Sequence, residues 1–170
     1  PDLILLDCSN TGVSKLDVSK NSKLSMLRCE NTKVEVLDVT QNPALSTLDC
    51  SGTGIEKIDV SQNPNLQFLY CSDTEINGLD ISKNSDLVAL ECLNCPLAWL
   101  NLGVSGIPQN LFDIPASAEV TLDVTEDQFD ITQEFPGIDV SKISNLSGAT
   151  LEGNIVKEYS SKQPISYTYD

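Results

Sequence analysis

The sequence predicts a mainly β protein: a solenoid of five 21-residue coils with parallel sheets and little or no α-helix, followed by a smaller β-rich domain. Two observations predict the solenoid. Five of the six cysteines recur every 21 residues, and leucines and other aliphatic residues repeat with the same period. A constant apolar skeleton at this period is typical of a solenoid, in which each coil buries its inner face on the next. The period ends near residue 107, so we expect a solenoid over 1–107 and a second domain over 108–170.

Each coil opens with a leucine, and we number the coils 1 to 5 from these residues. A second leucine follows at position 4, a cysteine at position 6, and aliphatic residues at positions 11, 14 and 16. Alternate residues of a strand point to opposite faces, so the Leu-x-Cys segment is expected to form a short strand that points both side chains inward. The opening leucines are Leu3, Leu24, Leu45, Leu66 and Leu87, and the cysteines are Cys8, Cys29, Cys50, Cys71 and Cys92.

The stacked cysteines are expected to stay reduced. Strands of a parallel sheet lie ~4.8 Å apart with their Cβ atoms pointing the same way, whereas a disulfide prefers Cβ atoms that converge to ~3.8 Å. Free cysteine behaves as a small buried hydrophobe. We therefore interpret the cysteines as packing residues.

Cys95 departs from this pattern because it stands at position 9, which is threonine in the other four coils, and because it forms a C-x-x-C pair with Cys92. Buried packing is the favoured interpretation, and a local disulfide between Cys92 and Cys95 is the alternative. A metal site is not expected, since the chain has no histidine and no second cysteine pair to complete four ligands.

Three polar positions also repeat. Threonine at position 9 and asparagine at position 19 are expected to hydrogen-bond backbone groups in the bends of each coil. Aspartate at position 15 is expected to cap the backbone of the following turn or to be solvated. Calcium between these carboxylates is the alternative, although no EF-hand spacing is present. The aspartates are Asp17, Asp38, Asp59 and Asp80.

The segment 108–170 contains 11 acidic and 3 basic side chains, which give it −8 of the total net charge of −15. Alternating apolar residues predict strands within 118–124, 128–132 and 164–170. Residues 149–156 are expected to form a hairpin around Gly153 and Asn154, and 135–145 a loop with a short helical turn. This domain is expected to cover the apolar face of the last coil.

The pattern L-x2-L-x-C-x2-T-x-[VIL], followed by [VIL]-x2-[LI]-D-[VI]-[ST]-x-N, resembles the leucine-rich repeat of the internalin family. More specifically, it resembles the cysteine-ladder repeats found in that family and in related surface proteins of gut bacteria. Residues 108–170 resemble the small β-sandwich-like segment that follows such repeats. The resemblance implies an extracellular bacterial module, on the cell surface or secreted, that acts in adhesion through protein binding. Pro1 and Asp2 match the last two positions of a repeat, so the array is expected to begin inside a coil.

Composition argues against several other functions. A net charge of −15 disfavours binding to nucleic acid or to an anionic membrane surface. No apolar run approaches the ~18 residues needed to span a bilayer. The absence of histidine removes His-based acid–base and nucleophilic catalysis. No enzymatic activity, cofactor or metal is therefore expected, and the fragment is expected to be a monomer.

Positions 3 and 5 of each coil flank the inward leucine and are expected to face outward on the concave sheet. Aromatic residues, Met and Arg are enriched in protein interfaces, which favours a binding surface here for a host or neighbouring-cell protein or glycan. The alternative interpretation of these residues is that they are scattered surface residues without a functional role. A structural spacer that projects other domains is the alternative function. The candidate ligand-binding residues are Met26, Arg28, Asp49, Phe68, Tyr70 and Glu91.

Overall fold

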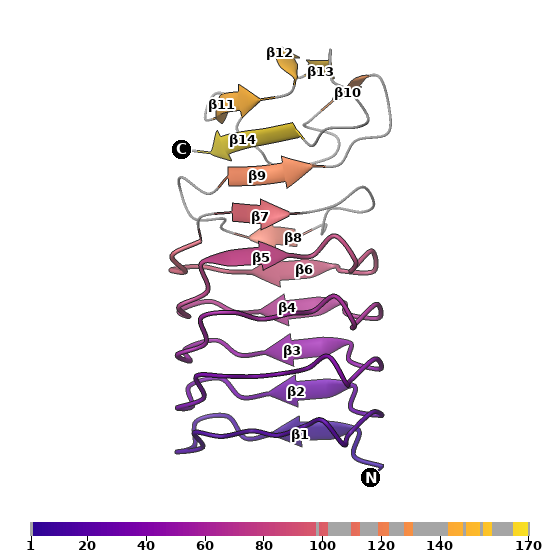
Figure 1. Ribbon diagram of the computed structural model, residues 1–170, viewed down its shortest axis with the longest axis vertical. Helices are drawn as coiled ribbons and strands as arrows, with labels where there is room; N and C mark the ends of the chain where they lie inside the picture. The colour runs from indigo at the N-terminus through magenta and orange to yellow at the C-terminus, as the bar shows by residue number, and fades with distance from the viewer. Residues whose placement is uncertain are drawn as a thin grey trace.

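The computed structural model describes residues 2–97, 99–101, 110–112, 119–122, 128–130, 143–147, 149–153, 155–157 and 165–169. Every regular element among them is a β-strand. Figure 1 shows the coils stacked one above another along the long axis of the molecule, with the N-terminus at one end. The predicted mainly β solenoid is therefore confirmed.

The first sheet takes one short strand from each coil. The strands are parallel, and each middle leucine lies beside the leucine 21 residues further along, as in the pair Leu27 and Leu48. The sheet therefore keeps the sequence period as its register. Its strands, in order, are β1 (Leu5–Asp7), β2 (Met26–Arg28), β3 (Thr47–Asp49), β4 (Phe68–Tyr70), β6 (Ala89–Glu91) and β8 (Asn110–Phe112).

Strand β8 lies in the segment that the sequence assigns to the C-terminal domain. It continues the first sheet in the same register, because Leu111 pairs with Leu90 of β6, 21 residues earlier. A strand of the solenoid sheet thus lies beyond residue 107, while the division of the chain into two domains stays a prediction.

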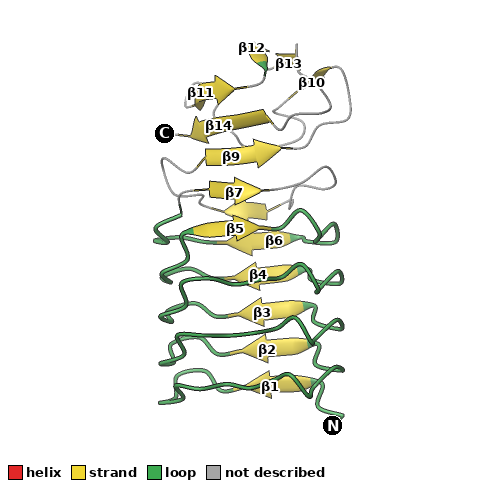
Figure 2. Ribbon diagram, in the orientation of Figure 1, coloured by secondary structure: helices red, strands yellow, loops and turns green. Residues whose placement is uncertain are grey.

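A second sheet forms on the other side of the coils (Figure 2). Its strands β5 (Gly78–Asp80), β7 (Trp99–Asn101) and β9 (Glu119–Leu122) are parallel. Strands β14 (Ile165–Tyr169) and β11 (Ile143–Ser147) then extend it in antiparallel fashion. Because β9 pairs with β7, strands of the C-terminal segment add directly to the last coil of the repeat.

The remaining strands are β10 (Gln128–Asp130), β12 (Thr150–Glu152) and β13 (Ile155–Lys157), which form a three-stranded antiparallel sheet. The predicted hairpin is confirmed by the pairing of β12 with β13, and Gly153 has the positive φ of 61° expected of its turn. Asn154 lies outside the described residues. The prediction of a loop over 135–145 is wrong at its C-terminal end, because strand β11 begins at Ile143. Residues 135–142 lie outside the described residues. The β-sandwich-like arrangement stays a prediction.

The core is a continuous column of inward leucines, cysteines and aliphatic residues. In coils 2 to 4 the strand leucines Leu27, Leu48 and Leu69 are fully buried, whereas Leu6 of coil 1 is only half-buried. Full burial of one such side chain stabilises the fold by roughly 1.5–3 kcal/mol. The stacking of coils is therefore the main source of stability.

Polar ladders run through the bends of the coils. Each position 9 threonine donates its hydroxyl to the carbonyl of the cysteine three residues earlier, at 2.6–2.8 Å. Asn63 donates both amide hydrogens to the preceding coil, to Val39 O and Asn42 O at 2.9 Å each. Asn42 and Asn84 bind in the same way at 2.9–3.0 Å. Both predicted ladders are confirmed.

Position 8 of each coil forms a further ladder that the sequence analysis did not identify. All five residues have φ between 56° and 65°, the left-handed region that Gly, Asn and Asp tolerate best. The recurrence of Asn, Asp or Gly at this position every 21 residues was the sequence signal for this turn. They are Asn10, Asn31, Gly52, Asp73 and Asn94.

Candidate functional site

The six predicted ligand-binding residues all lie on the outer side of the first sheet, which we call the sheet face. In β2, β3, β4 and β6 the middle leucine is buried, so the residues on either side of it point away from the core. The register aligns these outer side chains in two rows. The position 3 row contains Leu5, Met26, Thr47, Phe68 and Ala89, and the position 5 row contains Asp7, Arg28, Asp49, Tyr70 and Glu91.

Phe68 and Tyr70 form a stacked pair on this face. Their ring centroids are 6.5 Å apart and their planes differ by 16°. Both side chains are half-buried, so part of each ring stays open to solvent. In the register, Tyr70 lies between Asp49 and Glu91. The result is an aromatic surface with a carboxylate on either side.

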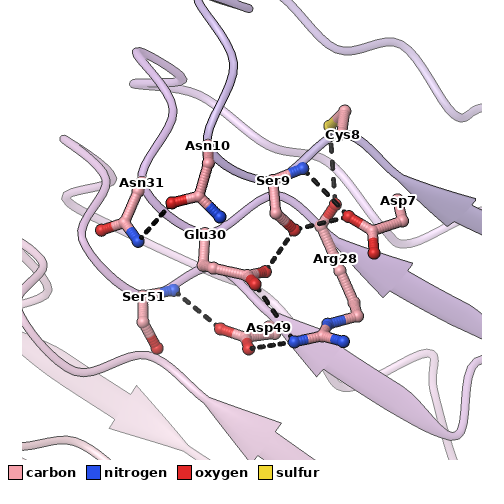
Figure 3. A network of polar contacts seen from close by, with 9 residues as sticks. All are labelled: Asp7, Cys8, Ser9, Asn10, Arg28, Glu30, Asn31, Asp49 and Ser51. Atoms are coloured by element: carbon pink, nitrogen blue, oxygen red, sulfur yellow. Dashed lines mark hydrogen bonds and ion pairs between the residues drawn. The ribbon is translucent and has the colours of Figure 1, made fainter.

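Arg28 is held by two carboxylates of the same face (Figure 3). Its Nη2 atom lies 3.1 Å from Glu30 Oε1 and 4.0 Å from Asp49 Oδ2. The Ser9 hydroxyl lies 2.5 Å from Glu30 Oε2, which ties the group to coil 1. The predicted residues are thus divided: Arg28 and Asp49 belong to an ion-paired cluster, and Phe68 and Tyr70 form a separate aromatic pair.

Sequence reasoning missed Glu30, the strongest partner of Arg28. The available signal was its place two residues after Arg28, where side chains of an extended chain return to the same face. Asp7 lies next to this cluster, and its pKa is lowered by hydrogen bonds from the Ser9 hydroxyl and the Ser9 backbone N–H.

The aspartate ladder on the other flank caps turns. Each aspartate accepts the backbone N–H two residues later at 2.9–3.0 Å. Asp17 and Asp38 also accept the hydroxyls of Ser19 and Thr40 at 2.7 Å, and these hydrogen bonds lower the pKa of both carboxyl groups. The capping interpretation is confirmed. In the described residues no group of three or more His, Cys, Asp or Glu side chains is placed to hold a metal ion.

All six cysteines are thiols, and Cys29, Cys50, Cys71 and Cys92 are completely buried. Burial raises the pKa of Cys29 to about 12 and also raises the pKa of Cys50 well above the ordinary value for a thiol. The ladder is therefore a column of buried, reduced thiols that pack in the core, as predicted. Cys95 is 5% exposed and packs in the threonine position against coil 4.

These features define a leucine-rich-repeat solenoid with a cysteine ladder. A solved structure, described as the functional domain of InlJ from Listeria monocytogenes including a cysteine ladder, is similar to this chain with a TM-score of 0.54 and 32% sequence identity. The similarity covers 64% of this chain and 27% of that one, so the match spans about a quarter of the solved chain. The predicted resemblance to internalin-type cysteine-ladder repeats is confirmed.

No protein-family model and no curated protein matches the chain. Among the described residues, no helix has both the length and the apolar character needed to cross a bilayer.

Proposed function

We propose that this chain is a non-catalytic binding module of a bacterial cell-surface or secreted protein, and that the sheet face binds a host or neighbouring-cell protein or glycan. The observation that carries the proposal is the stacked, half-open pair of Phe68 and Tyr70, in which Tyr70 lies between the carboxylates of Asp49 and Glu91. The similarity to InlJ supports the surface location.

The chemistry of the patch suits a ligand with a flat apolar face and hydrogen-bond donors at its edge. Aromatic rings offer large contact areas at low conformational entropy cost, and partly exposed rings at the centre of a face are typical binding hot spots. Asp49 and Glu91 would accept hydrogen bonds from sugar hydroxyls or from Lys and Arg side chains. Arg28 is already paired, so its main role in the proposal is to hold Asp49 in place.

The test is a binding screen of the chain against glycans and host surface proteins, with Tyr70→Ser and Phe68→Ser beside the wild type. Each substitution is expected to weaken the best binder at least about tenfold, as loss of a hot-spot side chain does. Val36→Ser is the matched control, because Val36 is 80% exposed and lies at the coil position that forms β5 in coil 4.

A rigid spacer is the second candidate. The ladders of threonine, asparagine and aspartate hydrogen bonds tie each coil to itself and to its neighbour, which suits a stalk that projects other domains. If every ligand in the screen binds the Tyr70→Ser and Phe68→Ser variants as tightly as the wild type, the sheet-face proposal is wrong and the spacer function is favoured.

A further inference from the structure

We propose that the sheet face binds an arginine side chain of a basic protein segment, whose guanidinium group lies on the Tyr70 ring and pairs with the Glu91 carboxylate. This inference rests on the function proposed above and names the chemical class of its ligand. A neutral glycan is the competing class, because sugar rings also bind to aromatic side chains.

The charge of the sheet face favours a cation. The two rows of this face, together with Glu30, contain four carboxylates and one guanidinium group. The whole chain has the same sign of charge, with a net value of −15. An excess of negative charge attracts cationic ligands and repels anions, which favours a basic segment over a sialylated or sulfated glycan. The carboxylates are those of Asp7, Glu30, Asp49 and Glu91, and the guanidinium is that of Arg28.

Coils 2 and 3 already hold a guanidinium group on this face (Figure 3). Arg28 Nη2 lies 3.1 Å from Glu30 Oε1, and 44% of the Arg28 side chain is exposed. Glu91, in coil 5, has no basic neighbour in its row, since the register pairs it with Tyr70 and Phe112. An arginine of the ligand would give Glu91 the kind of partner that Arg28 gives Glu30.

Tyr70 provides a flat surface beside the Glu91 carboxylate. Its ring is stacked with that of Phe68 at a centroid distance of 6.5 Å, and both side chains are half-buried. Parallel strands lie ~4.8 Å apart, so a cation over Tyr70 stays within reach of Glu91. A guanidinium group is planar, and it can stack on a ring while its N–H groups pair with a carboxylate at the ring edge. An ammonium group has no such plane, so arginine is favoured over lysine.

The test measures binding of the 170-residue chain to a synthetic peptide of alternating glycine and arginine by isothermal titration calorimetry. Matched peptides replace every arginine by lysine or by citrulline, the neutral isostere of arginine. The arginine peptide is expected to bind at least about fivefold more tightly than either matched peptide. Raising the NaCl concentration from about 0.05 M to about 0.5 M should weaken its binding. The proposal is overturned if the arginine peptide does not bind, or if the lysine or citrulline peptide binds as tightly.

Variants locate the binding site on the chain. Glu91→Gln and Tyr70→Ser are each expected to weaken binding of the arginine peptide at least about fivefold. Tyr70→Phe keeps the ring and is expected to bind like the wild type. Glu56→Gln is the matched control, because it removes the same charge from an exposed position outside the sheet face. An equal loss in Glu56→Gln and Glu91→Gln would show a response to overall charge, and would overturn the assigned site.

The arginine proposal and the sheet-face proposal fail in different ways. If the best binder of the screen loses affinity in Tyr70→Ser but not in Glu91→Gln, the sheet face is a binding surface and the arginine proposal alone is wrong. If that binder keeps its affinity in both Tyr70→Ser and Phe68→Ser, the sheet-face proposal is wrong, and the arginine proposal is wrong with it.

Discussion

Asn63 illustrates how single residues specify the coil. Its side-chain nitrogen donates to two carbonyl oxygens of the preceding coil, and its side-chain oxygen is buried without a hydrogen-bond partner. The amide orientation is fixed by these contacts, because the reverse orientation would bring an oxygen against both carbonyls. Asparagine is therefore required here as a double donor.

Replacing Asn63 by the nearly isosteric Asp should be strongly destabilising, since a buried carboxylate would face two carbonyl oxygens without a donor. We expect a loss of roughly 3–5 kcal/mol in the free energy of unfolding, measured by urea denaturation. The control is Asn65→Asp, because Asn65 is exposed and donates one bond to Pro43 O. An equal loss in the two variants would contradict the role assigned to the asparagine ladder.

Residue types alone predicted much of the candidate site. Phe68 and Tyr70 were correctly placed on one face because strand alternation depends only on the local backbone. Their stacking, and the pairing of Arg28 with Glu30 and Asp49, were not predicted, since side-chain rotamers depend on neighbours from adjacent coils. The same reason explains why the sequence predicted that Cys95 is buried but did not predict the contact of its thiol with Cys71 O in the preceding coil.

At the scale of elements, the stability of the turns that follow the aspartate ladder depends on the ionisation of the aspartate carboxyl groups. The folded-state pKa of Asp17 and Asp38 is lower than the ordinary value of 3.8. A carboxyl group with a depressed pKa stabilises the fold above its unfolded pKa and loses that contribution as pH falls through the folded value. Lowering the pH to 3.8 and below should therefore weaken these turns.

We expect the double variant Asp17→Asn, Asp38→Asn to lose less stability than the wild type between pH 7 and pH 3. Asparagine still accepts the backbone N–H of a turn but does not titrate in this range. Thermal unfolding at a series of pH values measures the effect, and Glu56→Gln serves as an exposed control. If the double variant and the wild type show the same pH dependence, the caps do not contribute to acid sensitivity.

Strand formation also differs between the two sides of a coil. Each coil forms a strand in the first sheet, but the second sheet begins only at β5 in coil 4. The sequence period is the same in all coils, so periodicity did not predict this difference. The pairing of β5 with β7, and of β7 with β9, shows that the second sheet forms where strands of the C-terminal segment add to it.

At the scale of the whole molecule, stability is the sum of contacts between neighbouring coils. Coil 1 has a neighbour on one side in this chain, which explains the partial exposure of Leu6, Cys8, Val13 and Leu16. In a solenoid such terminal coils contribute less stability and open first.

Leu48→Ala, in the central coil, should therefore cost about 2.7–5 kcal/mol, the range for a fully buried leucine. The equivalent Leu6→Ala should cost clearly less, because Leu6 is only partly buried. Urea denaturation of the 170-residue chain compares the two, and hydrogen exchange should show faster exchange in coil 1 than in coil 3. Equal costs, or uniform exchange rates, would contradict coil-by-coil stacking.

The sequence by itself determined the period, the strand register of the first sheet, the buried leucines and cysteines, and the polar ladders. These features repeat, and each follows from backbone geometry and from whether a side chain is apolar or a hydrogen-bond donor. Only the tertiary structure decided the Arg28 cluster, the aromatic stacking, the partner of Cys95 and the extension of both sheets by β8 and β9. These contacts occur once rather than in every coil, and they join residues that meet only after the coils are stacked.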